Sequence, residues 1–188
     1  LPLSHNWKGL YWDYENRQAL FRLSEHDHEV ACVEFSNDDL LLLSTGSQLD
    51  GKLFIWDTSN GFIVTSVQLI PTVLSSPPTC ASWGGFVKDV KLRPTSSYQF
   101  ATSGNKLMLW TLEPSTGALE YEQISTGTFI RNYICFSFSI PDEQYLFAGT
   151  ASGDFVSFQI KHKLLVFVQN VCAQGVKCIV AVSEDKVC

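Results

Sequence analysis

The stretch Asp50-Gly51-Lys52-Leu53-Phe54-Ile55-Trp56-Asp57 decides the fold, because it joins a tight turn to an apolar strand that ends in tryptophan and aspartate. Asp-Gly is a typical hairpin turn, since glycine tolerates the positive φ that such a turn requires. Leucine, phenylalanine and isoleucine follow without a polar residue between them, which is typical of a strand covered on both faces. We therefore predict an inner strand of a β-sheet at 53–57 and a second buried strand before the turn, at 40–45.

The same unit recurs along the chain. Apolar strands of this kind lie at 10–13, 53–57, 107–111 and 155–159, and their late aromatic residues are Trp12, Trp56, Trp110 and Phe158. These aromatic residues follow one another at intervals of 44, 54 and 48 positions, and a repeat of about 40 to 50 residues is typical of β-propeller blades. Each unit contains four strands, and the last alternates apolar and polar residues, which suits an outer rim. We predict an all-β fold of four-stranded antiparallel blades that stack radially, as in a β-propeller.

Turns and strands together divide the chain into blades. Because a closed propeller needs about 4 to 8 blades, we expect the ring to be incomplete in this chain and the chain to be part of a longer polypeptide. A proline-rich link at 70–78 separates the first complete blade from the second. The predicted blades are the end of one at 7–23, three at 24–71, 79–125 and 129–171, and the start of another at 176–188, with first strands of the later blades at 87–92, 133–138 and 176–182.

Composition limits the function classes. The 188 residues are 45% hydrophobic, which supports a packed core, and the formal net charge of -6 gives no basic field that would attract a nucleic acid. No apolar run approaches the roughly 20 residues that span a bilayer, and residues 1–8 lack the pattern of a secretory signal. The six cysteines form no Cys-x-x-Cys pair, so we expect reduced thiols. These features favour a cytoplasmic protein without nucleic-acid or membrane partners.

The segment from Glu25-His26-Asp27-His28-Glu29-Val30 through Phe35-Ser36 to Asp50-Gly51 and Trp56-Asp57 resembles the WD40 repeat. In that family a buried tetrad joins a loop histidine, a strand hydroxyl, a turn aspartate and a tryptophan. The resemblance places this tetrad at His26, Asp50 and Trp56, with either Ser44 or Thr45 as the hydroxyl. The arrangement is physically sound, because a buried carboxylate must be hydrogen-bonded and these groups satisfy one another.

The other two complete blades depart from that pattern. Gly104 and Ser152 stand where the turn aspartate would be, and Phe158 replaces the tryptophan of the last blade. Because these groups cannot form the same tetrad, we expect apolar packing to stabilise both blades.

Three longer segments, 10–17, 85–91 and 145–155, resemble the cilia- and flagella-associated protein 52 family, whose members line the lumen of axonemal doublet microtubules. The most specific segment is the last, in which Ala-Gly-Thr-x-Ser-Gly-Asp at 148–154 replaces the usual serine and tryptophan signature. The resemblance implies a non-catalytic scaffold that binds tubulin and neighbouring inner proteins. It also implies localisation at the axoneme of a cilium or flagellum.

One basic cluster, formed by Lys88, Lys91 and Arg93, is a candidate partner contact. We expect Lys91 and Arg93 to lie at alternate positions on one strand face. The simpler interpretation is a solvated strand end beside Asp89. The alternative is an electrostatic contact with an acidic partner surface, such as the tubulin that the family resemblance implies.

His26 and His28 are a candidate metal pair, because alternate residues of a strand share a face. Zinc usually has three or four protein ligands, so we interpret both as structural histidines and predict no metal and no cofactor. No Gly-x-Ser-x-Gly or phosphate-loop motif is present, so no catalytic residue is predicted. Three acidic pairs fall in expected turns, where carboxylates accept backbone hydrogen bonds: Asp38-Asp39, Asp142-Glu143 and Glu184-Asp185.

Two other functions fit the same sequence, because a fold does not determine a function. The first is a WD-repeat adaptor of another cytoplasmic complex, of the ubiquitin-ligase or trafficking type. The second is a propeller enzyme, which would need acids, histidines or metal ligands that converge at the central channel.

Overall fold

The computed structural model describes residues 9–104, 106–183 and 186–187, and all regular structure among them is β-strand. The predicted all-β class is confirmed. None of the described elements is a helix that could span a membrane. The chain divides into two compact units, Leu1–Pro77 and Pro78–Cys188, and their boundary falls within the proline-rich segment 70–78.

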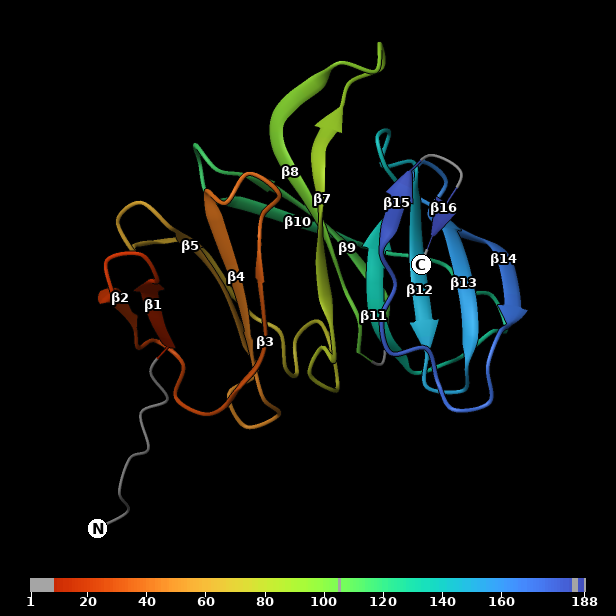
Figure 1. Cartoon of the computed structure of the whole chain (residues 1–188), viewed down its shortest axis with the longest axis horizontal. Coiled ribbons are helices and arrows are strands. Elements are labelled where there is room, and N and C mark those ends of the chain that lie inside the picture. The colour runs from red at the N-terminus through yellow and green to blue at the C-terminus, as the bar shows by residue number, and fades with distance from the viewer. Residues whose placement is uncertain (1–8, 105, 184–185, 188) are drawn as a thin grey trace. The chain divides into compact units, whose positions relative to one another are not determined.

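The first unit contains a two-stranded and a four-stranded antiparallel sheet (Figure 1). The four-stranded sheet follows the order of the sequence, because each strand is joined to the next by a short turn. The strands are β1 (Gly9–Asp13) with β2 (Gln18–Leu23), and β3 (Val30–Phe35), β4 (Leu41–Gly46), β5 (Lys52–Asp57) and β6 (Ile63–Gln68).

The second unit contains two four-stranded antiparallel sheets and a short hairpin. Its first sheet consists of β7 (Ala81–Lys88), β8 (Pro94–Thr102), β9 (Met108–Glu113) and β10 (Ala118–Gln123). Its second sheet consists of β11 (Tyr133–Phe138), β12 (Tyr145–Thr150), β13 (Asp154–Gln159) and β14 (Leu164–Asn170). The hairpin pairs β15 (Ala181–Ser183) with β16 (Lys186–Val187).

Burial divides each four-stranded sheet into inner and outer strands. Every residue of β4 is buried, and four consecutive residues of β5 are buried as well. The outer strands β6, β10 and β14 are exposed or half-buried along their length. In the second unit, Phe136, Leu146, Val156 and Phe158 of one sheet share a core with Leu109 of the neighbouring sheet. The two sheets therefore pack face to face, and their inner strands are the apolar ones because both of their faces are covered.

Each four-stranded sheet also has, between its first two strands, a turn that contains one non-glycine residue with positive φ. The residues that adopt a left-handed backbone conformation in these turns are Asp39 (φ 61°), Leu92 (φ 61°) and Glu143 (φ 51°). Asp142 accepts hydrogen bonds from Ser139 Oγ (3.0 Å) and from the Gln144 amide (3.2 Å). The acidic pairs at 38–39 and 142–143 thus lie in turns, as predicted.

The prediction of a strand at 87–92 is wrong, because β7 ends at Lys88. The Asp89 carboxylate accepts hydrogen bonds from the amides of Lys91 (2.7 Å) and Arg93 (3.0 Å), and these contacts close a turn. Val90 in this turn is fully exposed. The apolar residues of this segment suggest a strand in the sequence. The Asp89 carboxylate instead accepts hydrogen bonds from backbone amides of the segment, and these bonds favour a turn over a strand.

The last predicted strand, at 176–182, is also misplaced, because β15 begins only at Ala181. Upstream of it, the Val176 amide donates a hydrogen bond to the Thr150 carbonyl (3.0 Å). Residues 7–8 of the first predicted partial blade, and residues 184–185 and 188 of the last, lie outside the described residues. The acidic pair Glu184-Asp185 is among them.

We predict that Gly153→Ala destabilises the protein more than Gly127→Ala. Both glycines have positive φ (88° and 58°), which costs an alanine about 1 kcal/mol. At Gly153 the new Cβ would also overlap the carbonyl oxygen of Cys172, whereas nothing lies within 4 Å of a Cβ at Gly127. Urea denaturation should show about 2 kcal/mol of additional loss for Gly153→Ala. Equal losses would contradict the close approach at this turn.

Candidate functional site

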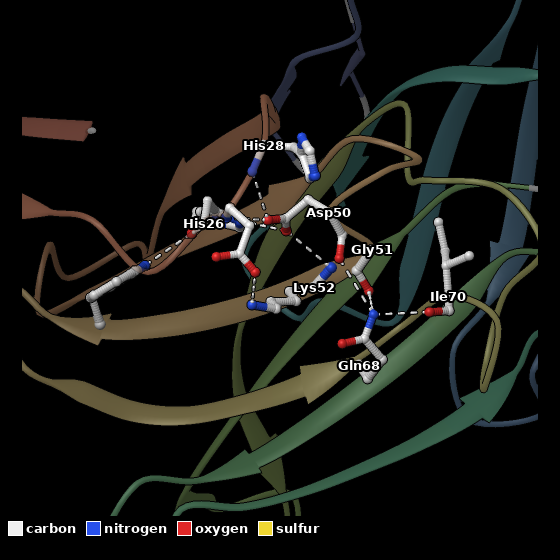
Figure 2. A network of polar contacts seen from close by, with 10 residues as sticks. His26, His28, Asp50, Gly51, Lys52, Gln68 and Ile70 are labelled. Atoms are coloured by element: carbon white, nitrogen blue, oxygen red, sulfur yellow. Dashed lines mark hydrogen bonds and ion pairs between the residues drawn. The ribbon is translucent and has the colours of Figure 1, made fainter. Parts of the chain in front are cut away.

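A buried carboxylate, Asp50, is the centre of the polar cluster in the first unit. It follows β4 and is 5% exposed. Its Oδ1 accepts hydrogen bonds from the amides of Asp27 (2.7 Å) and His28 (3.2 Å), and its Oδ2 accepts one from the Lys52 amide (3.2 Å). The same Oδ2 lies 2.8 Å from His26 Nδ1. Figure 2 shows these groups converging on the carboxylate from the loop before β3 and the start of β5.

A chain of side-chain hydrogen bonds connects Asp50 to Trp56. The indole Nε1 of Trp56 donates to Ser44 Oγ (2.9 Å), which lies 2.8 Å from His26 Nε2. Because the indole only donates, the serine proton is available to His26 Nε2, and the histidine therefore donates from Nδ1 to Asp50. Burial raises the pKa of Asp50, but the hydrogen bonds from His26 and the backbone amides outweigh burial and lower it. The carboxylate is thus held ionised.

The structure brings together four of the five predicted tetrad residues: His26, Ser44, Asp50 and Trp56. Of the two candidate hydroxyls, it selects Ser44. Thr45 points to the other face of β4, as neighbouring strand residues do, and its buried Oγ1 makes no hydrogen bond within the described part of the chain.

Two further contacts around Asp50 could not be predicted from the sequence pattern. The Gln68 side-chain amide donates to the carbonyls of Gly51 (3.2 Å) and Ile70 (2.9 Å), which joins the β4–β5 turn to the end of β6 (Figure 2). At the surface, Lys52 Nζ lies 2.6 Å from Asp27 Oδ2. Gln68 ties the outer strand to the same turn that holds the buried carboxylate.

We predict that two adjacent hydroxyl deletions in β4 differ in their effect on stability. Ser44→Ala should lower the free energy of unfolding by about 1–3 kcal/mol, because it leaves the Trp56 indole and His26 Nε2 unpaired in the core. Thr45→Val is the matched control and should be neutral or stabilising, because it removes a buried hydroxyl that has no partner among the described residues. Urea denaturation measures both. A loss for Thr45→Val as large as that for Ser44→Ala would contradict the network.

The blade formed by β7–β10 keeps only part of this arrangement. Trp110 Nε1 donates to Thr102 Oγ1 (2.9 Å), and both residues are fully buried. The neighbouring Ser103 Oγ accepts hydrogen bonds from the amides of Thr79 (3.1 Å) and Cys80 (3.0 Å). The tryptophan-hydroxyl pair therefore persists where the histidine and the turn aspartate are missing.

A different polar network occupies the corresponding region of the blade formed by β11–β14. Asp154 Oδ2 accepts hydrogen bonds from Ser152 Oγ (2.7 Å), Thr150 Oγ1 (3.1 Å) and Arg131 Nε (3.2 Å), and Asn170 Nδ2 donates to Oδ1 (3.1 Å). Asp154 is buried, and the hydrogen bonds from Ser152 and Asn170 lower its pKa to about 2. The expectation that apolar packing alone stabilises this blade is therefore wrong.

The lowered pKa of Asp154 predicts a loss of stability in acid. A carboxyl group whose pKa falls on folding stabilises the protein above its unfolded-state pKa, and that stabilisation disappears as the pH falls from about 4 to about 2. The difference in unfolding free energy between the natural chain and Asp154→Asn should therefore shrink over this range, as measured by urea denaturation. Glu29→Gln, a change at an exposed carboxyl group, is the control. A difference for Asp154→Asn that does not change with pH would contradict the ionised network.

The structure changes the interpretation of the basic cluster. Lys88 Nζ lies 3.2 Å from Glu143 Oε2, and the Arg93 guanidinium lies 2.8 Å from Asp89 Oδ2. Lys91 is exposed in the β7–β8 turn, so the expectation that it shares a strand face with Arg93 is wrong. Two of the three cations are thus paired within the chain, and Lys91 alone has no acidic partner among the described residues.

The ring nitrogens of His26 and His28 are not placed to bind one metal ion together. Both ring nitrogens of His26 are engaged, one with Asp50 and one with Ser44. His28 is exposed and contributes its backbone amide to the network. Within residues 9–104, 106–183 and 186–187, no three His, Cys, Asp or Glu side chains form a group that could hold a metal ion.

Comparison with known proteins establishes the class of fold. Residues 17–57 match the family model of the WD domain, G-beta repeat, and this range includes the four joined residues around Asp50. The β-propeller domain of Cps50 (Swd1) from Myceliophteria thermophila is similar in structure, with a TM-score of 0.67 at 14% identity over 93% of this chain and 52% of that one. The chain contains a WD repeat and folds as a segment of a β-propeller, with the ring incomplete.

Sequence comparison gives more specific relatives. The chain is 28% identical to human (Homo sapiens) cilia- and flagella-associated protein 52 over 161 residues, which cover 85% of this chain. It is 28% identical to the protein of the same name from Chlamydomonas reinhardtii over 156 residues, or 82% of this chain. The matches cover 24% and 23% of these relatives, so the chain spans about a quarter of their length. The resemblance predicted from the sequence is confirmed.

Proposed function

We propose that the chain is part of a non-catalytic WD-repeat scaffold of cilia or flagella, and that it acts as a microtubule inner protein that stabilises axonemal doublet microtubules. The observation that carries this proposal is the similarity to cilia- and flagella-associated protein 52 over more than four fifths of the chain, in both a mammal and a green alga. The similarity extends well beyond residues 17–57, the part of the chain that matches the WD-repeat model.

The arrangement of the buried polar groups supports a scaffold role. The buried histidine and carboxylates, which are residue types common in catalytic sites, are hydrogen-bonded within the chain. His26 contacts Asp50 and Ser44. Asp154 accepts hydrogen bonds from a serine, a threonine, an arginine and an asparagine. Both carboxyl groups have lowered pKa values, which suits permanent hydrogen-bond acceptors rather than groups that exchange protons near neutral pH.

Localisation of the tagged protein in ciliated cells tests the proposal. We expect a signal along the axoneme that survives detergent extraction, because an inner protein is retained by the microtubule wall. A soluble cytosolic pool without axonemal signal would contradict the proposal and would favour an adaptor of a ubiquitin-ligase or trafficking complex.

Within this proposal, Lys91 is the strongest candidate of the basic cluster for contact with an acidic microtubule surface. Lys88 and Arg93 are already paired with Glu143 and Asp89, so reversing them also breaks internal contacts. We predict that Lys91→Glu lowers the fraction that co-sediments with microtubules by a few fold, because it replaces attraction with repulsion. The triple reversal of Lys88, Lys91 and Arg93 should lower it at least as much.

The matched control for this prediction is Lys106→Glu, which reverses an exposed lysine elsewhere in the same unit. It should leave co-sedimentation unchanged. Unchanged co-sedimentation of both Lys91→Glu and the triple variant would remove the basic cluster from the proposed interface.

A further inference from the structure

The hairpin of β7 and β8 extends beyond the rest of its sheet (Figure 1). β9 accompanies β8 only over Tyr98–Thr102, whereas β7 and β8 remain paired as far as Lys88 and Pro94. The turn at the tip exposes two apolar side chains, Val90 (100%) and Leu92 (74%). Turns normally carry polar residues, so an exposed apolar tip indicates a contact surface.

A groove of about 760 Å³ separates this hairpin and β10 from the turns of the neighbouring blade. All of its lining residues belong to the second unit. Buried Leu109 and Ile160 contribute apolar lining, and Val90 and Leu92 of the hairpin tip contribute exposed apolar lining. The volume lies within the range of protein binding sites.

The charges in this groove are unbalanced. Its lining includes five carboxylates and three lysines, and Arg93, outside the lining, pairs with the lining carboxylate Asp89. Two of the lysines form ion pairs within the chain: Lys88 with Glu143 and Lys163 with Glu122. Among the described residues, the lining carboxylates Glu120 and Asp142 have no cationic partner and the lining lysine Lys161 has no acidic one, which leaves a net formal charge of -1 once Arg93 is included.

The register of the sheet fixes where this charge lies. Glu120 and Glu122 are alternate residues of β10, so they share one face of the sheet. They stand opposite Thr111 and Leu109 of β9, which line the same groove. Because Lys163 pairs with Glu122, one unpaired carboxylate, Glu120, lies beside the apolar lining, and the exposed hairpin tip bounds the groove on one side.

We propose that this groove, with the β7–β8 hairpin as one wall, binds an extended segment of a partner protein in which apolar side chains alternate with lysine or arginine. The apolar side chains cover Val90 and Leu92, and the cation pairs with Glu120. Charge complementarity selects a basic segment, because an acidic one would place like charges in a partly desolvated groove. This inference deepens the proposed scaffold function by giving the chemistry of one partner.

Three fluorescein-labelled peptides test the inference against the whole chain by fluorescence anisotropy. In these probes valine alternates with arginine, with glutamate or with glutamine. The arginine peptide should bind most tightly and should weaken as salt is raised, because salt screens exposed charges. Glutamate-peptide binding as tight as arginine-peptide binding would overturn the proposal.

Variants locate the binding on the surface. Glu120→Lys should weaken the arginine peptide about tenfold, since it converts an attraction into a repulsion, and Leu92→Asp should weaken it to a similar extent. The matched controls are Glu25→Lys and Leu49→Asp, two exposed positions in the first unit, which should bind as the natural chain does. Undiminished binding by both Glu120→Lys and Leu92→Asp would also overturn the proposal. Because the assay contains no microtubule, its failure leaves the axonemal localisation test unaffected.

Discussion

Burial of the inner strands on both faces is the constraint on which the structure depends. An apolar strand such as β4 must be covered by neighbouring sheets, and face-to-face packing of four-stranded units provides that cover in the second unit. The outer strands do not have to be covered on both faces, so they carry polar and charged residues, among them Glu120 and Glu122 of β10. The binding groove proposed above lies where such an outer strand meets the turns of the next blade.

Complete burial also explains why the polar networks are closed. A carboxylate under a packed sheet is tolerated only if each oxygen has donors, and Asp50 and Asp154 both meet this requirement with different partners. In one blade the donors are a histidine and backbone amides, and in the other they are hydroxyls, an arginine and an asparagine. The same physical demand thus has two chemical solutions in one chain.

The sequence predicted the features that depend on local pattern. The apolar run ending at Trp56 and the Asp-Gly turn before it were sufficient to predict β5 and its turn, because these residues are adjacent in the sequence. The groups around Asp50 were predicted from the resemblance to the WD40 repeat, because His26 lies 24 residues before Asp50. The network of Asp154 was not predicted, because it depends on which residues face each other across strands: Asn170 stands opposite Asp154 in the register of β13 and β14. The alternation of Thr150, Ser152 and Asp154 is the one signal that would have indicated it. The strand predicted at 87–92 overlaps β7 only at residues 87–88, because the Asp89 carboxylate accepts hydrogen bonds from the Lys91 and Arg93 amides and closes a turn after Lys88.

Hydrogen exchange of the native protein, resolved by residue, tests most directly whether burial of the inner strands and of Asp50 holds the fold together. The amides of β4, β5, β12 and β13 should exchange slowest, and those of the outer strands β6 and β14 should exchange faster. The Asp27 and His28 amides lie in a loop but donate to a buried carboxylate, so they should be protected nearly as well as the inner strands. Rapid exchange at these two amides, or equal protection of inner and outer strands, would contradict the claim that burial of the inner strands and of Asp50 holds the fold together.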